Sequence, residues 1–179
     1  MHVAARRTAA ALVEGGLSAG EAVAVLAGDP GQVAQVAQGI WLAGGSVTML
    51  HQPTPRTDLT VWRDDTLRVL RMIDARLVVV GAPFEAMADV LRDQGIAHRM
   101  IADLDSDREF SVVPAAEDDT ALLQLTSGST AEPKAVRITT PATCTPTWST
   151  VWPTWSAASP TRWSAGCRSS TTWAWSAAC

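Results

Sequence analysis

The sequence predicts an α/β fold in which a mostly parallel sheet lies between layers of helices. Apolar runs of about six residues alternate along the chain with amphipathic segments of about ten to fifteen, as in βαβ units. The run RLVVVG at 76–81 is apolar without interruption from Leu77 onward, as expected of a parallel strand covered on both faces. Glycines stand where helices should end. These three observations favour a layered helix-sheet-helix domain.

The first 57 residues contain signals for two helices and two strands. The first helix should stop at Gly15-Gly16, because glycine adopts the left-handed conformation that closes helices. Asp29 as N-cap and Pro30 at the first helical position should start the second helix. The predicted ranges are 3–14 and 30–43 for helices, 22–28 and 46–50 for strands, and 52–57 for a proline-containing loop.

The next segments continue the alternation. Residues 59–73 carry apolar side chains at helical spacing among Arg and Asp, which predicts an amphipathic helix. A further helix is predicted at 84–92, with strands at 76–81, 98–104 and 121–126. The acidic stretch DLDSDREF at 103–110 is interpreted as a solvated loop rather than a calcium site, because Arg108 stands where an EF-hand loop needs glycine.

Composition excludes several classes of function. The net charge is -4, and no basic stripe is present to neutralise nucleic-acid phosphates. The longest apolar span, 40–50, is about half of what a bilayer requires, so no membrane span is expected and a cytoplasmic protein is predicted. The three cysteines, Cys144, Cys167 and Cys179, indicate neither a disulfide scaffold nor a zinc site.

The most informative stretch is LQLTSGSTAEPKAV, residues 123–136. After an apolar strand it offers hydroxyls and a glycine, and then the single lysine of the chain. Hydroxyls and backbone N–H groups in a turn can surround a multiply charged phosphate, and a lysine adds positive charge. The spacing is not that of a Walker A loop, and an ordinary polar turn is the structural alternative. The candidate phosphate-binding residues are Thr126, Ser127, Gly128, Ser129, Thr130 and Lys134.

This stretch resembles the TSGSTGxPKGV signature of the AMP-forming adenylating enzymes, which include acyl-CoA synthetases, peptide-synthetase adenylation domains and fatty acyl-AMP ligases. LQLTSGST is similar to the LLQFTSGST of the fatty acyl-AMP ligase branch. QGIWLAGGSVTMLHQPTP at 38–55 also resembles a family segment. The resemblance covers residues 1–139, and it implies the N-terminal part of the large AMP-binding domain.

The resemblance also implies an activity. In that family ATP and a fatty acid yield acyl-AMP and pyrophosphate, and the acyl group passes to an acyl carrier protein or to coenzyme A. The six candidate residues would hold the β- and γ-phosphates of ATP, with Mg²⁺ bound to the phosphates. No catalytic residue and no protein ligand for a metal is assigned. Ala131 and Ala135 replace two glycines of the family loop.

Residues 140–179 differ in composition from the rest of the chain. From Pro141 onward, 32 of 39 residues are Ser, Thr, Trp, Pro or Ala. A linker, an aromatic binding tail and a frameshifted translation are the three interpretations. The last explains more, because STTWAWSA at 170–177, back-translated and shifted by one base, can spell the His-Asp-Met-Gly that resembles the family's continuation. We therefore expect a partial AMP-binding domain at 1–139, followed by a tail without a domain.

Two functions follow as expectations. The first is an acid-activating enzyme of the family, of which these 179 residues are a fragment that does not turn over by itself. The alternative is a non-catalytic nucleotide- or partner-binding module whose Trp-rich tail is genuine.

Overall fold

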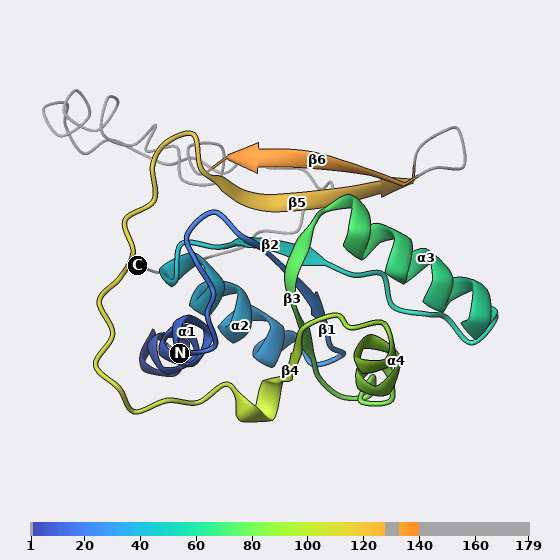
Figure 1. Cartoon of the computed structure of the whole chain (residues 1–179), viewed down its shortest axis with the longest axis horizontal. Coiled ribbons are helices and arrows are strands. Elements are labelled where there is room, and N and C mark those ends of the chain that lie inside the picture. Colours follow the sequence, from blue (N-terminus) through green and yellow to red (C-terminus); the bar gives the residue numbers. More distant parts are fainter. Residues whose placement is uncertain (1, 128–132, 140–179) are drawn as a thin grey trace, which may run out of the picture. The chain divides into compact units, whose positions relative to one another are not determined.

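The computed structural model describes residues 2–127 and 133–139, which form alternating helices and strands (Figure 1). The helices are α1 (His2–Glu14), α2 (Pro30–Leu42), α3 (Leu59–Met72) and α4 (Met87–Asp93), with a 3₁₀ turn, η1, at Ile101–Asp103. The strands are β1 (Ala22–Leu26), β2 (Ser46–Met49), β3 (Ala75–Val80), β4 (His98–Met100), β5 (Thr120–Ser127) and β6 (Pro133–Thr139).

The strands of the described residues form one sheet in the order β4-β3-β1-β2-β5-β6. Neighbouring strands from β4 to β5 are parallel, and β6 is antiparallel to β5. Parallel neighbours require crossover connections, and helices α2 and α3 supply them between β1, β2 and β3. The predicted α/β class with a mostly parallel sheet is therefore confirmed.

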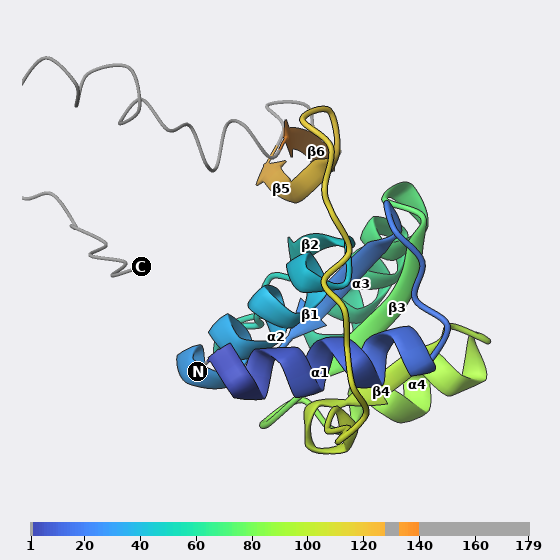
Figure 2. The same cartoon turned by 90° about the vertical axis from the view of Figure 1, so that its left-hand side faces the viewer.

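Two hydrophobic cores lie on the two faces of the sheet, and β1 contributes to both. Val23 and Val25 pack with residues of α1 and α2, in what we call the α1–α2 core. Ala24 and Leu26 pack with residues of α3 and α4, in the α3–α4 core. All four side chains are fully buried. Because successive side chains of a strand point to opposite faces, a continuously apolar strand fits between two helical layers (Figure 2).

Helix boundaries follow the sequence signals. The Asp29 carboxylate accepts a hydrogen bond from the backbone N–H of Gln32 at 2.7 Å, and Pro30 occupies the first turn of α2. Asp58 caps α3 in the same way, accepting from Thr60 at 2.8 Å. Beyond α2 the chain turns at Gly44, whose φ of 79° is strained for residues with a Cβ.

Replacing Asp29 with alanine should lower the free energy of unfolding by about 1 kcal/mol, because the N–H of Gln32 loses its acceptor. Urea denaturation followed by circular dichroism measures the change. Asp29→Asn is the matched control, since asparagine caps helices about as well as aspartate. Equal losses in both variants would contradict the capping role.

Two sequence predictions need correction. Residues 98–104 were expected to form one strand, but β4 ends at Met100 and η1 follows. Ile101 and Leu104 both pack against the α1–α2 core, and a 3₁₀ turn brings residues at this spacing to the same side. The helix predicted at 84–92 begins later, at Met87, because Phe84 lies in a turn and donates its N–H to Gly81. Strand β6 was not predicted.

A long connector, residues 104–119, runs from η1 past α1 and α2 to β5 (Figure 2). Arg7 holds it through ion pairs with Asp105 at 2.6 Å and Asp107 at 2.7 Å. Further along, the N–H of Val113 donates to the carbonyl of Leu42 at 3.0 Å. The acidic stretch 103–110 thus includes carboxylates that pair with the basic side of α1.

Candidate phosphate-binding site

The candidate loop is carried on a hairpin of β5 and β6. Thr126 and Lys134 are register partners across the two strands, and both are exposed. Because paired residues of antiparallel strands lie on the same face, the hydroxyl and the lysine side chain leave the hairpin on one side. The Thr126 hydroxyl also donates to the Lys134 carbonyl at 3.4 Å. The structure therefore brings together two of the six candidate residues.

Of the other four candidates, one lies at the end of β5 and three lie outside the described residues. Ser127 ends β5 opposite Pro133. Gly128, Ser129 and Thr130 lie outside the described residues, as does Ala131. The loop begins at the carboxyl end of a strand that is parallel to its neighbour β2, and this is the edge at which open α/β sheets bind ligands.

Both cores hold the hairpin to the rest of the sheet. Leu125 is buried in the α3–α4 core, with Leu123 and Ala135 packed beside it. Leu122 points the other way and packs against the α1–α2 core. Among the described residues, one register pair joins β2 to β5, Val47 with Leu122. The hairpin is thus attached along β5 as far as Leu125, and Thr126 and Lys134 form the next register pair beyond this anchor.

Strand β6, which follows the loop, carries a sequence signal that was not used in the prediction. The run KAVRIT at 134–139 contains β-branched residues, and Val136 and Ile138 face the same side of the hairpin as their partners Gln124 and Leu122. That composition is a strand signal. This signal predicts a hairpin in which Lys134 pairs with Thr126 across the two strands, instead of a lysine that only follows the loop in sequence.

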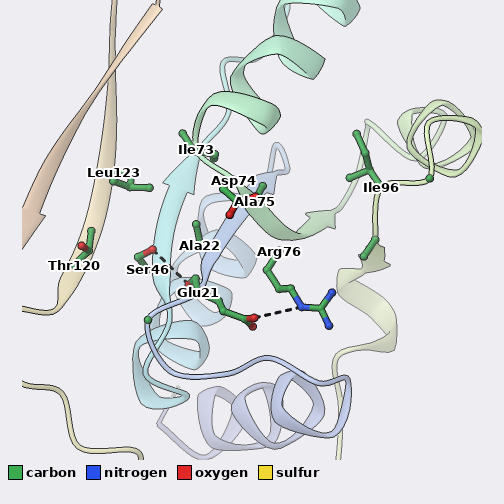
Figure 3. Close-up of a pocket in the computed structure, with 13 residues that line it drawn as sticks. Glu21, Ala22, Ser46, Ile73, Asp74, Ala75, Arg76, Ile96, Thr120 and Leu123 are labelled. Atoms are coloured by element: carbon green, nitrogen blue, oxygen red, sulfur yellow. Dashed lines mark hydrogen bonds and ion pairs between the residues drawn. The ribbon is translucent and has the colours of Figure 1, made fainter.

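A cavity of about 610 Å³ lies at the opposite edge of the sheet, where parallel strands begin (Figure 3). It is lined by the first residues of four strands, Ala22, Ser46, Ala75 and Thr120. Arg76 Nε lies 3.4 Å from Glu21 Oε1 beside it. None of the described candidate residues, Thr126, Ser127 and Lys134, lines this cavity.

Residues 2–127 and 133–139 contain neither a candidate metal site nor a candidate membrane span. No group of three or more His, Cys, Asp or Glu side chains in these ranges could hold a metal ion. None of the helices within them is long and apolar enough to cross a bilayer.

A mostly parallel sheet with a core on each face, covered by helices, places the described residues in the class of layered α/β domains. The family model described as AMP-binding enzyme matches residues 1–178, and the chain belongs to this family. The match includes residues 140–178, so the domain boundary that we placed at residue 139 stays a prediction.

Curated and solved relatives agree with the family. A Mycobacterium tuberculosis H37Rv protein named "Putative ligase Rv1013" is 48% identical over 139 residues, which are 78% of this chain and 26% of that protein. The solved fatty acyl-adenylate ligases from E. coli and L. pneumophila include a chain with a TM-score of 0.66 and 21% identity, over 77% of this chain and 24% of that one.

A third relative is the o-succinylbenzoate coenzyme A synthetase of Bacillus subtilis, solved with ATP and magnesium ion. Its TM-score is 0.63 at 18% identity, over 78% of this chain and 35% of that one. Likenesses at this identity show the fold of the N-terminal part of an adenylate-forming enzyme. The chain spans about a quarter of the length of the curated relative and about a third of that of the synthetase.

Proposed function

We propose that this chain contributes the triphosphate-binding loop of a ligase that activates a fatty acid with ATP, giving acyl-AMP and pyrophosphate. One observation carries the proposal: the hairpin pairs Thr126 with Lys134 at the mouth of the loop. The fatty acid as substrate is supported by the likeness of LQLTSGST to the fatty acyl-AMP ligase loop and by the fatty acyl-adenylate ligases among the structural relatives.

The proposed chemistry is one of binding and charge stabilisation. Thr126, Ser127, Gly128, Ser129 and Thr130 would donate hydroxyl and backbone N–H groups to the β- and γ-phosphates, and Lys134 would add a positive charge. The carboxylate oxygen of the acid then attacks the α-phosphorus, the bond to the β-phosphate oxygen breaks, and pyrophosphate leaves with the electron pair. Donors held in position around the phosphates would stabilise the charge that develops on the leaving group.

Magnesium would be carried by the nucleotide in this proposal. The candidate residues are hydroxyls, a glycine and a lysine, and none of them is the carboxylate that Mg²⁺ usually binds. The described part of the chain also holds no cluster of His, Cys, Asp or Glu that could hold a metal. We therefore assign no magnesium ligand to these residues. Mg²⁺ would neutralise phosphate charge while it is bound to ATP.

Location and acyl acceptor complete the proposal. ATP and activated fatty acids are used inside the cell, so we place the protein in the cytoplasm. The acceptor would be an acyl carrier protein or coenzyme A. The relatives include fatty acyl-adenylate ligases and a coenzyme A synthetase, and nothing in the described residues favours either acceptor.

The 179-residue chain should bind ATP without catalysing adenylation. Binding is expected from the loop, whereas no catalytic residue is assigned in this chain. Equilibrium dialysis with ATP, in competition with tripolyphosphate, tests binding. ATP–pyrophosphate exchange with dodecanoate tests turnover. Failure of ATP to bind would contradict the proposed loop, and exchange above background would contradict the expected inactivity.

A further inference from the structure

The indole of Trp41 joins α2 to the base of the phosphate-loop hairpin. Its Nε1–H donates to the carbonyl of Ala121 in β5 at 2.8 Å, across 80 positions of sequence. Trp41 lies in the last turn of α2 and its side chain remains 42% exposed. A tryptophan this exposed gains only part of the available burial energy, so the hydrogen bond is its most specific contact.

This bond adds a contact from α2 at the start of a hairpin that β2 and both cores also hold. Among the described residues, one register pair joins β2 to β5, and it involves Leu122, the residue next to Ala121. Leu125 anchors the hairpin in the α3–α4 core. Trp41 comes from α2, in the layer on the other face of the sheet. The two contacts therefore hold β5 from both sides.

A change in angle at the base of β5 is transmitted along the strand toward Thr126 and Lys134. Thr126 lies five residues beyond Ala121 on the same strand, which is a distance of about 17 Å at about 3.3 Å per residue. Leu125, the residue before Thr126, is buried in the α3–α4 core, so loss of the Trp41 bond would turn β5 about this anchor. Such a turn would change the direction in which the Thr126 and Lys134 side chains leave the hairpin.

We propose that Trp41 is a positioning residue for the phosphate loop: its indole N–H fixes the angle of β5, so that Thr126 and Lys134 meet the nucleotide phosphates. The inference rests on the proposed function for its ligand. The attachment of the hairpin can be tested without any ligand.

The test compares two tryptophan-to-phenylalanine variants of the full chain. Trp41→Phe removes the N–H that holds Ala121. Trp62→Phe removes an equivalent N–H, whose acceptor is the carbonyl of His51 at 2.8 Å rather than a residue of the hairpin, and phenylalanine keeps an aromatic ring in the α3–α4 core. Trp41→Leu, which also lacks the donor, shows whether the ring itself matters. Circular dichroism confirms that each variant is folded.

We expect Trp41→Phe and Trp41→Leu to raise the Kd for ATP about fivefold, which is the size of effect that loss of one neutral hydrogen bond can produce. The Kd for AMP should be unchanged. Amide hydrogen exchange in 120–127 and 133–139 should become faster, and exchange in β1 and β3 should not change. Trp62→Phe should leave the Kd for ATP and the exchange of the hairpin as in the unchanged chain.

Each result decides a separate point. Unchanged hydrogen exchange in the hairpin of Trp41→Phe would overturn the inference, whether or not ATP binds. Faster exchange with an unchanged Kd for ATP would also overturn it, because the loop would not depend on the attachment. Absence of ATP binding to the unchanged chain would overturn the proposed function and, with it, the role toward phosphate.

Discussion

Replacing Leu26 with alanine should lower the free energy of unfolding by about 2–5 kcal/mol. Leu26 is fully buried at the end of β1, inside the α3–α4 core. Its removal leaves a cavity between the sheet and two helices, and the surrounding backbone is held by hydrogen bonds such as that from Gly81 N to Leu26 O at 2.9 Å. Domains are stable by only about 5–15 kcal/mol, so this loss is a large share of the total.

The same substitution on the surface provides the control. Leu59, the first residue of α3, is 64% exposed, and Leu59→Ala should change the stability by no more than about 0.5 kcal/mol. Urea denaturation followed by far-UV circular dichroism measures both variants. Similar losses of unfolding free energy in the two variants would contradict the burial of β1 between the two helical layers.

Replacing Lys134 with alanine should weaken ATP binding about tenfold or more, because hydrogen bonds to charged groups contribute more than neutral ones. Lys134 is exposed in β6, opposite Thr126. In the proposed site it meets the β- and γ-phosphates, which AMP lacks. AMP binding should therefore change little, and the ratio of the two Kd values is the specific readout.

The control removes an equal charge elsewhere. Arg68 is exposed on α3 and pairs with Asp65 at 2.8 Å, away from the hairpin. Arg68→Ala changes the net charge of the protein by as much as Lys134→Ala, so it corrects for long-range attraction of the nucleotide. Equilibrium dialysis with ATP and with AMP measures each variant. An equal loss for both nucleotides in Lys134→Ala would argue against contact with the terminal phosphates.

Much of the fold could be predicted because its signals are local. Asp29 and Pro30 start α2 as expected, and Gly44 follows its end, because capping depends on atoms within about one helical turn. The run at 76–81, apolar from Leu77 onward, predicted a strand between two layers, and β3 contributes buried residues to both cores. The TSGST run also indicated the family before any contact was known.

The sequence by itself determined the helices, most of the strands and the chemical groups of the loop, since periodicity, capping and composition act over a few neighbouring residues. Only the tertiary structure decided which of these groups meet. It ended β4 at Met100, set Lys134 opposite Thr126, and brought Trp41 to Ala121. Strand register and contacts across 80 residues arise from the packing of whole layers on the two cores, and no local pattern encodes that packing.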